Sequence, residues 1–127
     1  MNYKVLIVDD SKLARMAAAK ALGSCFPDWV RVEAASAADA TRVVQQDSPD
    51  IALVDYNMPG VDGLALVAEL RKLKPAMPIA VISANHQQEI VSRASELHAT
   101  FLPKPLSEKS LAEFLNAAIK DLGPAGS

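Results

Sequence analysis

The feature that most constrains the fold is a strand-like segment followed by a helix-like segment, repeated five times along the chain. Short runs rich in Val, Ile and Leu predict strands at 3–10, 30–35, 51–55, 78–84 and 100–105. Apolar residues three and four positions apart predict helices at 11–23, 36–46, 63–73, 87–97 and 107–123. Because most of the strand runs are apolar without alternation, both faces of the sheet are expected to be buried. The sequence therefore predicts an α/β fold with helices on both sides of a five-stranded parallel sheet.

The ends of the first and last helices carry recognisable signals. Ser11 and Ser107 stand where these helices are expected to begin, and Gly23 stands where the first is expected to end. One face of the last helix is apolar and consists of Leu111, Leu115, Ala118, Ile119 and Leu122. The opposite face is expected to meet solvent or a partner and includes Glu113, Asn116 and Lys120.

The length and charge of the chain limit what it can bind. The 127 residues fit one domain, which we place at 1–122, followed by a flexible C-terminal tail at 123–127. Fifteen acidic and 13 basic residues give a net charge of -2 without a basic block, so neither a nucleic acid nor a membrane surface is expected as a partner. The single cysteine, Cys25, cannot form an internal disulfide, and no apolar run approaches the roughly 18 residues of a membrane span. We expect a cytoplasmic protein.

Polar residues stand at the carboxyl ends of four of the five predicted strands. The first strand ends in Asp9 and Asp10, the third in Asp55 and the fourth in Ser83, and the fifth delivers Lys104 immediately before Pro105. In an open parallel sheet these ends form one edge, where ligands bind. Three clustered carboxylates repel one another and raise one another's pKa unless nearby cations hold them ionised. One lysine supplies only one positive charge against three negative ones. Carboxylate oxygens suit a hard divalent ion, so the sequence predicts a magnesium site at this edge.

Each of these residues also has an ordinary interpretation when it is taken alone. Asp9 and Asp10 are common loop and helix-cap residues, and Asp55 is a common turn residue. Lys104 is most simply a solvated lysine, and the Ser83 hydroxyl can satisfy a backbone group. Their joint position at one edge of the sheet is what favours a shared site.

In this order, Asp9-Asp10, Asp55, Ser83-Ala84 and Lys104-Pro105 resemble the receiver domain of two-component response regulators, over residues 3–122. The resemblance implies the flavodoxin-like strand order 2-1-3-4-5, which is known for the chemotaxis member of that family. It also implies a bacterial, stand-alone, single-domain response regulator in which Asp55 accepts a phosphoryl group. The donor would be a histidine kinase or a histidine phosphotransfer protein.

The resemblance assigns a role to each residue of the site. Asp9, Asp10, Asp55 and the Asn57 backbone carbonyl would hold Mg²⁺ or Mn²⁺. Ser83 and Lys104 would act with Asp55 as the catalytic residues by contacting the phosphoryl oxygens, and phosphoryl transfer asks mainly for such positioning and charge neutralisation.

Further roles concern the loops and the response to phosphorylation. The resemblance implies that Pro59, Gly60 and Pro105 shape loops beside the site, with a cis peptide bond before Pro105. Asn57 and Asn85 would tune the lifetime of the phosphoryl group.

Ser83 and Phe101 would form the switch, although Phe101 is equally an ordinary core residue of an edge strand. Ser83 replaces the commoner threonine, and His98-Ala99 replaces the usual Gly-Ala pair before the fifth strand.

The resemblance also implies two docking surfaces. A target protein would bind the face made by the fourth helix, the fifth strand and the fifth helix. A histidine-bearing helix would dock near the first helix, at Leu13, Met16 and Lys20, although any packed helix offers such a face. The protein would be a monomer or a weak dimer after phosphorylation. It would be a signalling switch rather than an enzyme, catalysing only its own phosphorylation and dephosphorylation. Motility, phosphorelay and enzyme control remain open as outputs.

Three other classes of protein share part of this pattern. An aspartate-nucleophile phosphohydrolase normally has a second carboxylate two residues after the nucleophile, where this chain has Asn57. A flavodoxin-like electron carrier should have a Ser/Thr/Gly-rich phosphate loop, whereas "DDSKLA" at 9–14 is acidic. A pseudo-receiver regulated only by protein binding is disfavoured because every phosphorylation residue is present.

Overall fold

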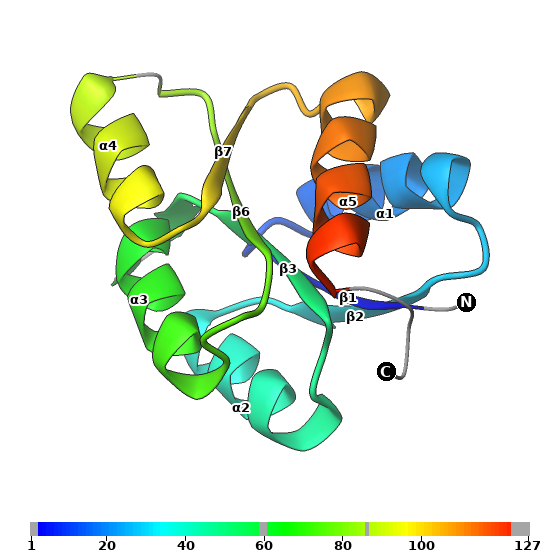
Figure 1. Cartoon of the computed structure of the whole chain (residues 1–127), viewed down its shortest axis with the longest axis horizontal. Coiled ribbons are helices and arrows are strands. Elements are labelled where there is room, and N and C mark those ends of the chain that lie inside the picture. Colours follow the sequence, from blue (N-terminus) through cyan, green and yellow to red (C-terminus); the bar gives the residue numbers. More distant parts are fainter. Residues whose placement is uncertain (1–2, 59–60, 86, 123–127) are drawn as a thin grey trace.

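The centre of the protein is a five-stranded parallel sheet, as predicted. The computed structural model describes residues 3–58, 61–85 and 87–122. The strands are β1 (Lys4–Val8), β2 (Val30–Ala34), β3 (Ile51–Asp55), β6 (Ile79–Ser83) and β7 (Thr100–Pro103). Their order in the sheet is β2-β1-β3-β6-β7 and all four pairings are parallel (Figure 1). Numbered within this sheet alone, that is the order 2-1-3-4-5, which confirms the flavodoxin-like fold.

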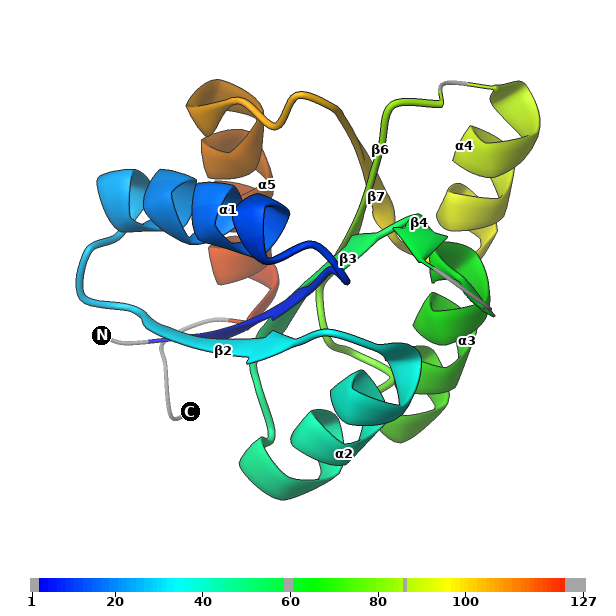
Figure 2. The ribbon, with the colours of Figure 1, turned by 180° about the vertical axis from the view of Figure 1, so that it is seen from behind.

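Five helices cover the two faces of the sheet. They are α1 (Lys12–Cys25), α2 (Ala37–Asp47), α3 (Gly63–Leu73), α4 (Gln88–Glu96) and α5 (Glu108–Leu122). Helices α1 and α5 lie on one face, and α2, α3 and α4 lie on the other (Figures 1 and 2). None of the helices in the described ranges is both long and apolar enough to cross a membrane.

The sheet divides the buried side chains into two cores. Along β1, Leu6 and Val8 pack toward α2, α3 and α4, whereas Val5 and Ile7 pack toward α1 and α5. Strands β3 and β6 are buried along their whole length because both of their faces are covered. Continuous apolar sequence in these strands thus follows from the three-layer arrangement.

Two local predictions about helix ends are confirmed and one is wrong. The hydroxyl oxygens of Ser11 and Ser107 accept the backbone N–H groups of Ala14 and Ser110, as N-caps do. Gly23, however, does not end α1, which continues to Cys25. A glycine inside a helix costs only about 1 kcal/mol relative to alanine, so α1 continues through Gly23 and ends just before Phe26 and Pro27.

A short antiparallel hairpin was not predicted. Strands β4 (Asn57–Met58) and β5 (Val61–Asp62) pair with each other. Figure 2 shows β4 beside the carboxyl end of β3. Two-residue strands are too short to show a periodic pattern in the sequence. Pro59 and Gly60, for which a loop-shaping role was predicted, lie outside the described residues, as does the predicted tail at 123–127.

The turn before β7 forms without the usual glycine. His98 has a backbone φ of 57°, in the left-handed region that glycine adopts most easily. The substitution of histidine for glycine therefore does not prevent the turn.

Gly63 lets α3 begin in direct contact with the end of β3. Its N–H donates a hydrogen bond to the carbonyl oxygen of Tyr56 at 2.8 Å. A Cβ atom at this position would lie 2.5 Å from the carbonyl oxygen of Asp55 and 2.7 Å from Cα of Tyr56. Since both are backbone atoms of the strand end, only a hydrogen atom fits, and the close approach fixes the segment that carries Asp55.

We therefore expect Gly63→Ala to lower the free energy of unfolding by about 1–3 kcal/mol, because the added methyl group overpacks a backbone contact. Gly23→Ala is the matched control. There a Cβ atom meets only the Arg31 side chain, at 3.4 Å, so we expect a gain of about 0.5–1 kcal/mol from helix propensity. Urea unfolding of both variants measures the difference, and equal stabilities would contradict the proposed contact.

Candidate functional site

The three predicted carboxylates come together at the carboxyl edge of the sheet. Strands β1 and β3 are neighbours, so Asp9 and Asp10, which follow β1, lie next to Asp55 at the end of β3. One carboxylate oxygen from each residue lies within 4.8 Å of the others. Asp9 and Asp55 are buried and Asp10 is exposed. The cluster is therefore open to solvent on one side, which gives an ion a way in.

Lys104 forms an ion pair with Asp55. Its Nζ lies 2.6 Å from Oδ1 of Asp55, and the exposed fractions of the two side chains are 34% and 4% respectively. This Oδ1 is buried, and within the described part of the chain the Lys104 ammonium is its charged partner. The bond between Lys104 and Pro105 is cis, as the resemblance implied.

Ser83 lies beside Lys104 at the end of the adjacent strand. The backbone N–H of Lys104 donates to the carbonyl oxygen of Ser83 at 3.0 Å. The Ser83 side chain is fully buried, and its Oγ accepts the N–H of Asn85 at 3.0 Å. The strand ends therefore bring Ser83, Lys104 and the carboxylates to one edge.

Asn57, Asn85 and Phe101 occupy positions around this edge. Asn57 opens the β4–β5 hairpin and is exposed, and the Oδ1 of Asn85, also exposed, accepts the N–H of Gln87 at 3.1 Å. Phe101 on β7 is partly buried and packs against the core under α2, α3 and α4. Their roles in phosphoryl lifetime and switching stay predictions, as does the loop-shaping role of the exposed Pro105.

The electrostatics of the site leave it short of positive charge. Burial is the main cause that raises the pKa of Asp9 above its usual value of 3.8, and the negative charges of Asp55 and Asp10 raise it further. The Ser11 N–H, 2.9 Å from Oδ1 of Asp9, and the Lys104 ammonium act in the opposite direction. Three carboxylates with one ammonium leave a shortage of positive charge, and carboxylate oxygens are the ligands that a hard divalent cation takes.

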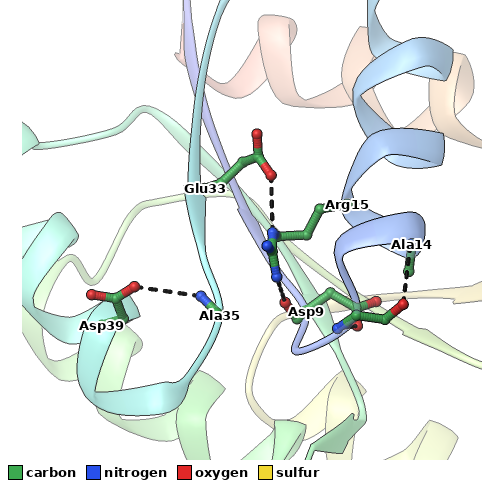
Figure 3. Close-up of polar contacts among 7 residues, drawn as sticks. Asp9, Ala14, Arg15, Glu33, Ala35 and Asp39 are labelled. Atoms are coloured by element: carbon green, nitrogen blue, oxygen red, sulfur yellow. Dashed lines mark hydrogen bonds and ion pairs between the residues drawn. The ribbon is translucent and has the colours of Figure 1, made fainter.

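Sequence reasoning missed one connection to this site. Arg15 on α1 donates from Nη1 to the backbone carbonyl oxygen of Asp9 and from Nε to Glu33 on β2 (Figure 3). The available signal was the position of Arg15, because it lies three and seven residues before the buried Ala18 and Leu22 on the same face of α1. A charge on an apolar helix face needs a partner, and that partner is Glu33 together with the Asp9 carbonyl.

A groove of about 510 Å³ adjoins the site between α1 and the residues that follow β7. Its lining is largely apolar and includes Ala14, Ala17, Ala18, Ile82 and Leu106, together with Asp9 and Lys104. Two large apolar side chains of α1, Leu13 and Met16, are 78% and 56% exposed. The surface beside the charged cluster is thus apolar.

Comparison with known proteins agrees with this geometry. A family model described as the response regulator receiver domain matches residues 5–116. The chain belongs to the response regulator receiver family. Receiver domains are signalling switches of two-component systems. The site described above lies within the matched residues.

Individual relatives span this receiver domain to different extents. The chain is 32% identical over 121 residues to the chemotaxis protein CheY of Thermotoga maritima, and the match covers 94% of this chain and 100% of that protein. It is 37% identical over 118 residues to the positive alginate biosynthesis regulatory protein of Pseudomonas aeruginosa, covering 90% of this chain and 46% of that protein. The chain thus spans less than half the length of the first curated relatives that it matches.

A solved structure shows the same fold. The CheY-like receiver domain protein from Methanospirillum hungatei superposes with a TM-score of 0.86 at 21% identity, covering 96% of this chain and 98% of that one.

The raised pKa of Asp9 predicts that Asp9→Asn stabilises the metal-free receiver domain. Folding favours the protonated form of Asp9, so its ionisation destabilises the folded state at pH 7 and has no effect once the pH falls below its usual pKa of 3.8. We expect the melting temperature of Asp9→Asn in a chelator to exceed that of the wild type by a few degrees at pH 7, with the gain vanishing in acid.

A control variant, Asp39→Asn, should change the melting temperature in the opposite direction. The guanidinium of Arg42, followed by the N–H of Ala35, lowers the pKa of Asp39, so Asp39→Asn should lower the melting temperature at pH 7. A rise for both variants would show that the gain is not specific to the acidic cluster, and no rise for Asp9→Asn would show that Asp9 does not destabilise the fold.

Proposed function

We propose that the chain is a phosphorylation switch in which Asp55 accepts a phosphoryl group in a magnesium-dependent reaction. The observation that carries this proposal is the buried Asp55 carboxylate, with the Lys104 ammonium 2.6 Å from one oxygen and Asp9 and Asp10 beside it. Within a receiver family member, this arrangement has the groups that phosphoryl transfer to a carboxylate requires.

The residues that would hold the cation are the carboxylates of Asp9, Asp10 and Asp55 and the backbone carbonyl of Asn57. When bound, Mg²⁺ or Mn²⁺ supplies positive charge that offsets the negative charge of the phosphoryl oxygens. The oxygen donors and the shortage of positive charge described above support this assignment.

The transfer step uses the chain's own side chains as follows. A carboxylate oxygen of Asp55 forms a bond to the phosphorus of a phosphohistidine, the phosphorus–nitrogen bond breaks, and the imidazole nitrogen keeps the electron pair. Lys104 neutralises part of the charge on the phosphoryl oxygens. Ser83 Oγ accepts the N–H of Asn85, and its O–H is the donor that we assign to a phosphoryl oxygen.

The new charge on Asp55 would then shift an equilibrium between two conformations. Ser83 joins the phosphoryl group to β6, and Phe101, on the neighbouring β7, packs against the core that α4 covers. These contacts support Ser83 and Phe101 as the switch. Asn57 and Asn85, both exposed near Asp55, are the residues that we expect to set the phosphoryl lifetime.

We assign the phosphoryl donor to a histidine kinase or a histidine phosphotransfer protein that docks on α1. The apolar groove and the exposed Leu13 and Met16 favour an apolar helical partner close to Asp55. The lone Cys25 favours the reducing environment of the cytoplasm.

The first experiment is the intact mass of the protein after incubation with magnesium and acetyl phosphate. We expect one added phosphoryl group in the wild type, and none in Asp55→Asn or in the presence of a chelator. Asp62→Asn is the matched control, because Asp62 is an exposed carboxylate that caps α3, and asparagine caps equally well. It should be phosphorylated like the wild type.

Failure to find the adduct would have a definite meaning. If rapid quenching and a phosphorylated histidine donor also give no added mass, Asp55 is not an acceptor. The chain would then act as a receiver that is regulated only by protein binding.

A second prediction concerns the target surface made by α4, β7 and α5. Glu113, Asn116 and Lys120 are exposed on α5, as the sequence predicted. We expect their combined replacement by alanine to weaken binding of the phosphorylated form to its target by about tenfold or more, since interface energy concentrates in few residues. Alanine at Gln45 and Gln46, exposed on α2, is the control. Unchanged affinity in the α5 variant, measured calorimetrically, would move the target site elsewhere.

A further inference from the structure

Arg15 joins three separate elements next to the acidic cluster, and the proposed phosphoryl chemistry does not use it. Its Nε lies 2.9 Å from Oε1 of Glu33 on β2, and its Nη1 lies 2.6 Å from the backbone carbonyl oxygen of Asp9 (Figure 3). The Arg15 side chain is only 15% exposed. A largely buried guanidinium with two acceptors is a fixed group, because its planar fork loses little freedom when it binds.

The Asp9 carbonyl belongs to the peptide group that links Asp9 to Asp10. The peptide is planar, so holding its oxygen fixes the orientation of the whole unit, and the two acidic side chains stand on either side of it. Two further bonds tighten the same segment. The Ser11 N–H donates to Oδ1 of Asp9 at 2.9 Å, and the Arg15 N–H donates to the Ser11 carbonyl oxygen at 3.0 Å.

Glu33 anchors Arg15 from the edge strand of the sheet. It is the register partner of Ile7 on β1, and the N–H of Asp9 donates to the carbonyl oxygen of Ala34 at 3.1 Å. Because the Glu33 carboxylate offsets the charge of the guanidinium, the pair adds little net charge to the cluster. Its contribution is therefore geometric: β2 holds Arg15, and Arg15 holds the end of β1.

We infer that Arg15 is a positioning residue for the divalent cation, acting through its hydrogen bond to the Asp9 carbonyl and anchored by Glu33. The inference rests on the proposed function, because the cation site is part of it. Arg15 touches neither the cation nor the phosphoryl group. It holds the Asp9–Asp10 peptide so that both carboxylates face one ion, as outer residues do at metal sites.

The positioning role of Arg15 and its positive charge predict opposite effects of its removal on the affinity for Mg²⁺. Loss of a nearby positive charge would by itself tighten the binding of Mg²⁺, whereas loss of the held peptide would weaken it. Arg15→Gln removes both the charge and the fork, and Arg15→Lys keeps the charge but cannot bind Glu33 and the Asp9 carbonyl in the same way. We expect both variants to bind Mg²⁺ about tenfold more weakly than the wild type.

The experiment is a titration of each metal-free protein with Mg²⁺, followed by the amide chemical shifts at the ends of β1 and β3. The amide spectrum before metal addition shows that each variant is folded. Arg42→Gln is the control, because Arg42 is also an ion-paired arginine but is exposed on α2 and pairs with Asp39. Its Mg²⁺ affinity should equal that of the wild type.

A second readout separates positioning from general stability. In phosphorylation with acetyl phosphate, the Mg²⁺ concentration that gives half the maximal rate should rise about tenfold in Arg15→Lys, while the rate at saturating Mg²⁺ stays close to that of the wild type. A purely structural role of Arg15 would not raise the half-saturating Mg²⁺ concentration while leaving the rate at saturating Mg²⁺ unchanged.

Glu33 variants decide the inference if the Arg15 variants do not fold. Glu33→Gln and Glu33→Ala both remove the charge, but only alanine removes the acceptor that anchors Arg15. We expect Glu33→Ala to bind Mg²⁺ more weakly than Glu33→Gln, and equal affinities would overturn the inference.

Each remaining outcome also has one meaning. If Arg15→Gln binds Mg²⁺ more tightly, or Arg15→Lys binds it as well as the wild type, Arg15 has no positioning role, although the proposed function stands. If the wild type itself binds no Mg²⁺, the proposed metal site fails and the inference fails with it.

Discussion

The negative charge of Asp55 at the buried end of β3 is the constraint to which the surrounding structure is adjusted. A carboxylate that has lost most of its water is unfavourable unless positive charge or hydrogen-bond donors replace that water. The Lys104 ammonium, 2.6 Å away, is the compensation that the protein itself provides. Two more carboxylates stand at the neighbouring strand end and increase the demand for positive charge. Repulsion among the three carboxylates destabilises this edge of the sheet.

Away from this edge, most of the apolar side chains of the fold are buried and several of its helix and strand ends are hydrogen-bonded. The central strands are buried on both faces, helix α1 and helix α5 begin with serine caps, and the carboxyl ends of the strands are joined by backbone hydrogen bonds such as that from Lys104 to Ser83. Destabilised sites of this kind are common where proteins bind ions or substrates. The structure therefore combines a well-packed sheet with an edge that is short of positive charge.

The sequence allowed most of the fold to be predicted because each segment of it carries a periodic pattern. Five strand-helix units follow from apolar runs and helical spacing, and the positions of Asp9, Asp55 and Lys104 follow from the rule that strand ends share an edge. The strand order came from the family resemblance. The β4–β5 hairpin and the end of α1 beyond Gly23 escaped prediction, since two-residue strands show no pattern and a single glycine is a weak helix stop.

The contact between Arg15 and Glu33 was missed for a different reason. It joins α1 to an edge strand, and no spacing along the chain shows which helix residue faces which strand residue until the register of the sheet is known. The carboxylate cluster was easier to predict, because all its members stand at strand ends and need no knowledge of how helices pack.

The division of the interior into two cores has a consequence for how such a protein changes over evolutionary time. Among the described residues, no buried side chain belongs to both cores, so only the backbone of the sheet connects them. Substitutions beneath α1 and α5 can accumulate with little effect on the packing beneath α2, α3 and α4, because additivity holds for sites that share no partner. The helices beside the apolar groove can therefore change in sequence while the packing of the opposite layer stays the same.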